Sequence, residues 1–149
     1  FVDKAAPFNS LDGICKWASE LGYKGIQIPT WESSLIDLDK ASESQDYCDE
    51  LLGKVKSYGL EITELSTHLQ GQLVAVAPAY DLMFDNFAPD NLKKNPKERT
   101  KWAIETVKKA AIASRRLGLK THATFSGALL WHTWHPWPQA PKELEENGL

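Results

Sequence analysis

The sequence predicts an α/β fold in which parallel strands alternate with helical crossovers. Three stretches share one pattern: a helix ends at a glycine, a short apolar strand follows, and the strand leads into a loop. The glycines are Gly22, Gly59 and Gly118, and glycine adopts cheaply the left-handed conformation that ends many helices. Repeated units of this kind specify a parallel sheet with helices between its strands.

The first unit is a helix followed by a strand at residues 25–29. Asn9 or Ser10 is placed to cap the helix. The apolar positions of this helix recur at helical spacing and form one face: Leu11, Ile14, Cys15, Ala18 and Leu21. Residues 35–41, beyond the strand, leave room for a helical turn.

The second unit holds the strand with the most polar chemistry. Ser42 or Ser44 can cap its helix, which is expected to bury Tyr47, Leu51, Val55 and Tyr58. The strand covers residues 60–67, and its alternation predicts two faces. One face carries Glu64, Ser66 and His68, and the other carries Thr63, Leu65 and Thr67.

The third unit begins after a long loop at residues 69–92, a length that is uncommon and usually functional. Asn95, Pro96 and Glu98 form a helix start with a capping box. The helix runs to about Leu117, and a strand at residues 120–125 follows. The residues expected to be buried on this helix are Ala103, Val107, Ala110, Ala111, Ser114 and Leu117.

Aligning the three glycines predicts which residues are neighbours across the sheet. The alignment groups Gln27 with Glu64 and Ala123, and it groups Trp31 with His68 and Gly127. Ligands gather at the carboxyl ends of strands in parallel sheets. The second group is therefore expected near a ligand.

Composition narrows the function classes. The 149 residues suit one domain, and the net charge of −3 provides no electrostatic footprint for nucleic acid or an anionic membrane. No apolar run approaches the roughly 20 residues of a membrane span. Cys15 and Cys48 are expected to be buried free thiols in a reducing, cytoplasmic compartment rather than a disulfide.

The candidate site residues each have two readings. His68, beside Glu64 and Ser66, could act as an acid or base or bind a metal, or it could simply bond a loop carbonyl. Glu64 could orient His68, bind a metal or pair with a lysine. His122 could contact substrate or be a buried structural histidine.

Aromatic residues give the remaining candidates. A sugar-like ligand could stack on a wall of indole rings formed by Trp31 and by Trp131, Trp134 and Trp137 of a proline-bearing loop. Alternatively, these side chains could pack over the end of the sheet or form a contact between subunits. The spacing of His132 and His135 matches a metal site only loosely.

Three segments resemble a known family. They are residues 64–73, with the sequence ELSTHLQGQL, together with residues 78–81 (PAYD), and residues 122–127 (HATFSG). They are similar to sugar phosphate isomerases/epimerases in the xylose isomerase-like TIM barrel superfamily. The resemblance implies that residues 1–149 form a single domain, the first half of such a barrel, an α/β half TIM barrel.

The resemblance also implies a metal-dependent isomerase or epimerase acting on a sugar or sugar phosphate. From the placement of the residues we expect catalytic roles for His68 and Glu64, and substrate contacts for Trp31, His68, His122, Trp131 and Trp134; the resemblance supports the substrate contacts of the two histidines. The divalent metal (Mn, Zn, Mg or Co) would be held in the complete enzyme by ligands expected mainly outside this chain.

Three alternatives stay open. The chain could be a catalytically incomplete half-barrel that assembles with itself as a homo-oligomer or with a complementary half-barrel. It could also be an inosose dehydratase-like enzyme. An apurinic-site endonuclease is disfavoured because the sequence shows no basic groove.

Overall fold

A computed structural model describes residues 5–127 and residue 129. The chain divides into two compact units, and each is described by itself. The first comprises Phe1–His68 and Thr106–Thr124, and the second comprises Leu69–Glu105 and Phe125–Leu149. Trp131, Trp134, Trp137, His132 and His135 lie outside the described residues.

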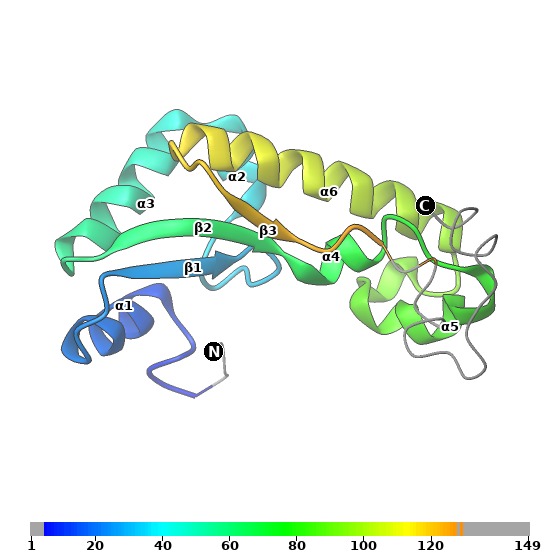
Figure 1. The fold of residues 1–149 in the computed structure, drawn as a ribbon, viewed down its shortest axis with the longest axis horizontal. Coiled ribbons are helices and arrows are strands. Elements are labelled where there is room, and N and C mark those ends of the chain that lie inside the picture. Colours follow the sequence, from blue (N-terminus) through cyan, green and yellow to red (C-terminus); the bar gives the residue numbers. More distant parts are fainter. Residues whose placement is uncertain (1–4, 128, 130–149) are drawn as a thin grey trace, which may run out of the picture. The chain divides into compact units, whose positions relative to one another are not determined.

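The first unit contains a parallel three-stranded sheet in the order β1-β2-β3 (Figure 1). Its elements in chain order are α1 (Leu11–Glu20), β1 (Gly25–Pro29), α2 (Leu38–Glu43), α3 (Gln45–Ser57), β2 (Glu61–Thr67), the C-terminal part of α6 (Pro96–Arg116) and β3 (His122–Thr124). The predicted α/β class with parallel strands is confirmed. In the described residues β1 and β3 are the edges of the sheet.

The helices of this unit start and stop where the local chemistry predicts. Ser10 caps α1 by accepting a hydrogen bond from the amide of Gly13, and Ser44 caps α3 in the same way through Tyr47. Gly22, Gly59 and Gly118 all have positive φ angles, as expected for residues that end helices. The turn expected in residues 35–41 is α2, which Asp37 caps.

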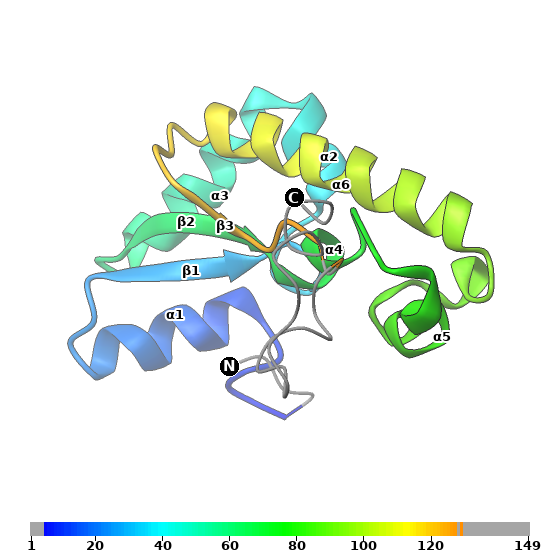
Figure 2. The same ribbon diagram turned by 45° about the vertical axis from the view of Figure 1, so that its right-hand side comes forward.

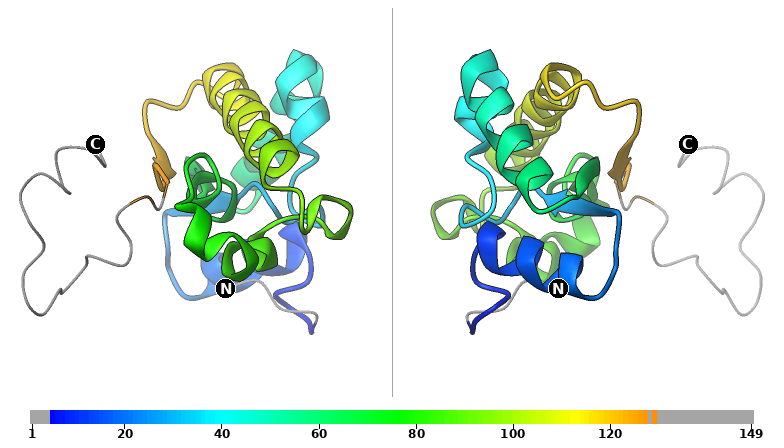
Figure 3. Two further views of the ribbon diagram at one scale, coloured as in Figure 1. Left: turned by 90° about the vertical axis from the view of Figure 1, so that its right-hand side faces the viewer. Right: turned by 90° about the vertical axis from the view of Figure 1, so that its left-hand side faces the viewer.

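One hydrophobic core joins the helices to the sheet. Cys15 of α1, Cys48 and Val55 of α3, and Ala113 of α6 pack in the same cluster as Leu65 of β2. Figures 2 and 3 show α1, α3 and this end of α6 along the strands. Because Leu65 reaches this core, the opposite face of β2 is the one that carries Glu64.

One burial prediction on α6 is wrong, and one residue of the predicted apolar face of the first helix lies outside α1. Leu21 is 59% exposed, since α1 ends at Glu20 and Leu21 already belongs to the turn. Ala111 is exposed and Ala113 is buried in its place, which shifts the buried stripe of α6 around the helix axis. Both cysteines are free and buried, as expected.

A β-bulge modifies the predicted alternation of β2. The partners of Ile26 and Gln27 are Ile62 and Glu64, so Thr63 is an extra residue. Ile62 and Leu65 are consequently both buried although they are three positions apart. After the bulge the predicted faces hold: Leu65 faces the core, and Glu64 bonds Gln27 on the other face.

The second unit replaces the expected long loop with short helices. They are α4 (His68–Gln72), η1 (Pro78–Tyr80), α5 (Asp81–Phe84), η2 (Asp85–Phe87) and η3 (Asp90–Leu92), followed by the start of α6. Leu73, Phe84 and Ala103 form its small core. In residues 5–127 no helix combines the length and apolar character that a membrane span requires.

Candidate functional site

The candidate site extends from the middle of β1 and β2 to their carboxyl ends in the first unit. Gln27 and Glu64 are paired across the two strands, and Gln27 Nε2 donates to Glu64 Oε1 at 2.6 Å. This hydrogen bond holds the carboxylate on the face of the sheet opposite the helical core. The glycine alignment predicted this pairing of Gln27 with Glu64, and it is confirmed.

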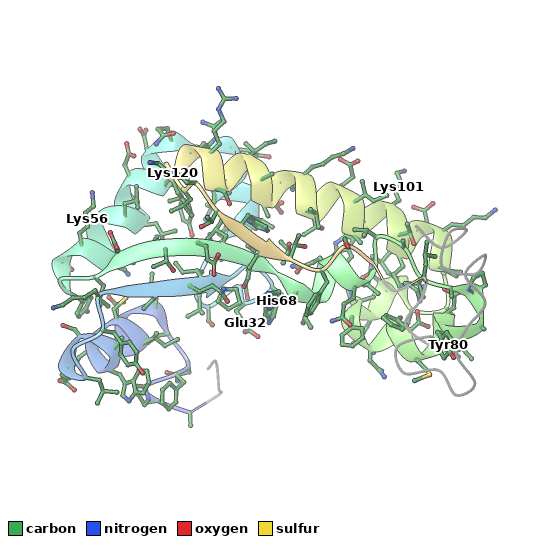
Figure 4. The ribbon with its side chains drawn as sticks, in the orientation of Figure 1. Glu32, Lys56, His68, Tyr80, Lys101 and Lys120 are labelled. Atoms are coloured by element: carbon green, nitrogen blue, oxygen red, sulfur yellow. The ribbon has the colours of Figure 1, made fainter. Side chains whose placement is uncertain are left out.

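His68 follows β2 directly and lies beside Trp31 from the loop after β1. The two ring centroids are 5.9 Å apart with the planes inclined by 38°. Figure 4 labels His68 at the end of β2 and Glu32 just beyond β1. The predicted neighbours Trp31 and His68 therefore meet at the edge of the sheet where parallel folds bind ligands.

The backbone turns into a helix at His68, which the sequence reasoning missed. β2 ends at Thr67 and α4 begins at His68, so strand alternation no longer determines the direction of the His68 side chain. The imidazole is half-buried.

Ser66 lies between Glu64 and His68 on the strand and is fully buried. Its Oγ has no hydrogen-bond partner in the part of the chain that the structure describes. A buried hydroxyl without a partner costs about 1–3 kcal/mol, and such groups are found at functional sites. The sequence analysis placed Ser66 on the Glu64 face, and the pairing with Pro29 and Ala123 agrees with that placement.

His122 occupies the other face of the sheet. It is paired with Leu65, whose side chain lies in the helical core, and its ring bonds Ser114 of α6 and Thr67 of β2. Burial lowers the pKa of His122 below its usual value; His68 adds to this shift, whereas the charge of Glu64 opposes it. This placement corresponds to the structural reading of His122 and does not support a direct contact with substrate.

The register of β3 differs from the one that the glycine alignment predicted. Ala123 is paired with Ser66, two residues beyond the Glu64 position that the glycine alignment predicted. The predicted grouping of Ala123 with Glu64 is therefore wrong. Ala123 lies five positions after Gly118 and Ser66 lies seven positions after Gly59, and the extra residue at the Thr63 bulge accounts for one of the two positions of difference.

The described residues offer few metal ligands. No group of three or more His, Cys, Asp or Glu side chains that could hold an ion occurs among them. Glu64 and His68 supply one carboxylate and one imidazole, fewer than the three or four protein ligands of a typical catalytic metal site. The described residues thus do not form such a site by themselves.

Parallel strands packed on helices, with polar groups at their carboxyl ends, are compatible with a partial (β/α) barrel. The family model of the xylose isomerase-like TIM barrel matches residues 15–147. The chain therefore belongs to the xylose isomerase-like TIM barrel family, as the resemblance implied. A search among curated proteins found no match.

Proposed function

We propose that this chain supplies part of the substrate pocket of an isomerase or epimerase that acts on a sugar or sugar phosphate. The observation that carries the proposal is the group at the ends of β1 and β2. There the Glu64 carboxylate, oriented by Gln27, lies on the strand that leads to the His68 imidazole, and His68 lies beside the Trp31 indole.

The chemistry suited to this group is proton transfer next to a carbonyl. A base removes the proton from the carbon beside the carbonyl, and the C–H electrons form an enediol. Returning the proton to the neighbouring carbon isomerises the sugar, whereas epimerisation requires a second acid that delivers a proton to the opposite face of the same carbon. Glu64 is proposed to carry the proton on its carboxylate, and His68 to exchange a proton with a substrate oxygen.

The local contacts suit these roles. The amide of Gln27 bonds one oxygen of Glu64, which fixes the carboxyl plane and leaves the second oxygen able to accept a proton. The indole of Trp31 provides an apolar face on which a sugar ring can stack.

The remaining predicted contacts extend this pocket. Trp131 and Trp134 stay proposed as further substrate-stacking residues. A divalent metal (Mn, Zn, Mg or Co) stays a prediction for the complete enzyme, with its ligands mainly outside this chain. Glu64 and His68 alone do not make a binding site for this metal.

A matched pair of variants tests the proposal. The protein is assayed against a panel of aldoses, ketoses and their phosphates with each of the four metals, and products are separated by chromatography. Glu64→Gln is expected to lower kcat by about 10²–10⁴-fold, the usual contribution of a general acid or base. Glu61→Gln, the same change at the opposite end of β2, is expected to leave kcat unchanged. Equal activity of the two variants would remove Glu64 from the reaction.

A second candidate is a half-barrel that assembles with a copy of itself or with a complementary half. It is favoured by the two edge strands: in the described residues β1 and β3 each pair on one side only. Light scattering distinguishes the candidates. A monomer that converts a sugar alone would exclude assembly as a requirement, and activity confined to a dimer or mixed complex would support it.

A further inference from the structure

A chain of hydrogen bonds links α6, β3 and β2 through His122. Nδ1 of His122 lies 3.1 Å from Ser114 Oγ, and Nε2 lies 2.9 Å from Thr67 Oγ1. Thr67 Oγ1 in turn donates to Thr124 Oγ1 at 2.8 Å. Ser114 and Thr67 are buried, so both bonds of the imidazole lie away from bulk solvent.

The donors and acceptors in these hydrogen bonds determine which tautomer the His122 ring adopts. The single hydroxyl proton of Thr67 is used toward Thr124, so Thr67 Oγ1 can only accept from His122. Nε2 must therefore carry the proton. In a neutral imidazole Nδ1 is then an acceptor, and the Ser114 hydroxyl donates to it.

Thr67 connects this network to the candidate site. It is the last residue of β2, and His68 is the first residue of α4. The side chain of Thr67 is held by two hydrogen bonds at the point where the backbone leaves the strand. A fixed Thr67 limits the directions in which the next residue can leave the sheet, and hence where His68 meets Trp31.

We propose that His122 is a positioning residue: in its neutral Nε2–H form it anchors Thr67 against α6 and thereby places the imidazole of His68 beside Trp31. The effect on catalysis rests on the proposed function of His68, whereas the effect on the position of His68 does not. His122 acts through Thr67 and touches no substrate.

The test uses nitrogen-15 NMR of the histidine rings, which needs no substrate. The ring signals are assigned with His68→Gln and His122→Gln. In the wild-type protein at neutral pH, His122 is expected to show a protonated Nε2 and an unprotonated Nδ1. A ring found with the proton on Nδ1, or doubly protonated, would overturn the proposal.

Variants then test the link to His68. Thr67→Val keeps the shape but removes the hydroxyl, and Ser114→Ala removes the donor to Nδ1; each is expected to shift the His68 ring signals. Thr67→Ser keeps the hydroxyl and should restore them. Thr63→Val, the same substitution at the exposed bulge of β2, should change neither ring. His68 signals that stay unchanged in both Thr67→Val and Ser114→Ala would refute the link.

Measurements of enzyme activity distinguish the positioning role of His122 from the proposed sugar chemistry. With an active substrate, Thr67→Val is expected to lower kcat about ten- to a hundredfold with little change in KM, and Thr67→Ser to recover it, because a misplaced catalytic group costs rates of this order. If the His68 signals move but no sugar is converted by any form of the protein, the positioning role stands and the sugar chemistry fails. If Thr67→Val folds as judged by circular dichroism and kcat stays unchanged in an active enzyme, the positioning role fails. If Thr67→Val does not fold, Ser114→Ala is judged by the same criteria.

Discussion

Replacing Arg99 should destabilise the second unit more than any exposed substitution on α6. Arg99 is fully buried, and its guanidinium bonds Asp85 Oδ1 and the backbone carbonyl of Asp81, each at 2.7 Å, as well as the Asp81 carboxylate. These contacts tie the short helices after β2 to the start of α6. Arg99→Met keeps the length of the side chain but removes every one of these donors.

The expected loss of stability depends on the carboxylates that stay buried after Arg99 is replaced. Removing one partner of a buried ion pair typically costs about 3–5 kcal/mol, since the other charge stays buried. The Asp85 side chain is 9% exposed, but it keeps the amide of Lys94 at 2.8 Å, and the Asp81 side chain is 27% exposed. We therefore expect the lower end of that range, a decrease of about 3 kcal/mol in the free energy of unfolding.

The pH dependence has a definite sign. Burial by itself raises the pKa of Asp85, but the Lys94 amide and the Arg99 guanidinium outweigh it, so the pKa of Asp85 is lowered overall. The stability from this carboxylate is then fully present above its unfolded pKa of about 3.9 and is lost as pH falls through the lower folded value. The difference between wild type and Arg99→Met should shrink over the same acid range.

Urea unfolding and amide hydrogen exchange measure this effect. The Lys94 amide, which donates to Asp85, should exchange faster in Arg99→Met. Lys101→Met, on the exposed side of α6, is the control and should change the free energy of unfolding by no more than about 0.5 kcal/mol. An Arg99→Met variant as stable as the control would refute the reasoning.

Two further predictions concern glycines and thiols. Gly53 lies within α3 with open space around it, so Gly53→Ala should raise the free energy of unfolding by about 0.5–1 kcal/mol. Gly59 has a φ of +73°, so Gly59→Ala should lower the free energy of unfolding by about 1 kcal/mol. Thermal melts in which both variants are more stable than the wild type, or both less stable, would contradict this. Burial raises the pKa of Cys15 to about 11 and also raises the pKa of Cys48. Neither thiol should react with a disulfide reagent at pH 8 until the protein unfolds, and rapid labelling of the native protein would contradict this. The free energy of unfolding should fall as pH rises above 9, the ordinary pKa of a cysteine, because the thiols ionise in the unfolded chain before they ionise in the folded protein.

The predictable part of the fold depended on local signals. Gly22 and Gly59 end their helices at equivalent places, so the spacing to Gln27 and Glu64 carried over directly into the pairing of β1 with β2. The same spacing brought Trp31 to His68. These relations needed only helix ends and strand lengths, which residues a few positions apart determine.

What could not be predicted depended on contacts between distant segments. The bulge at Thr63 leaves no mark in a single strand, since it is defined by the partner strand. The pairing of β3 was also out of reach, since its register differs by two residues from the glycine alignment, although a shift of two leaves each side chain on the same face.

Arg99 left a signal that was missed. It precedes Ala103 by one helical turn on the buried stripe of α6, and Asp81 and Asp85 have the same spacing in the segment before it. A charged residue on a buried stripe needs partners of opposite charge.

Solvent exchange at the substrate tests the central claim most directly, because it reports proton transfer even when no net conversion accumulates. A substrate found in the sugar panel is incubated with the protein in D₂O, and proton NMR follows the hydrogen on the carbon beside the carbonyl. The account predicts that deuterium replaces this hydrogen with the wild-type protein and with Glu61→Gln, and far more slowly with Glu64→Gln. Conversion of the sugar without deuterium uptake, or equal uptake with Glu64→Gln and Glu61→Gln, would contradict it.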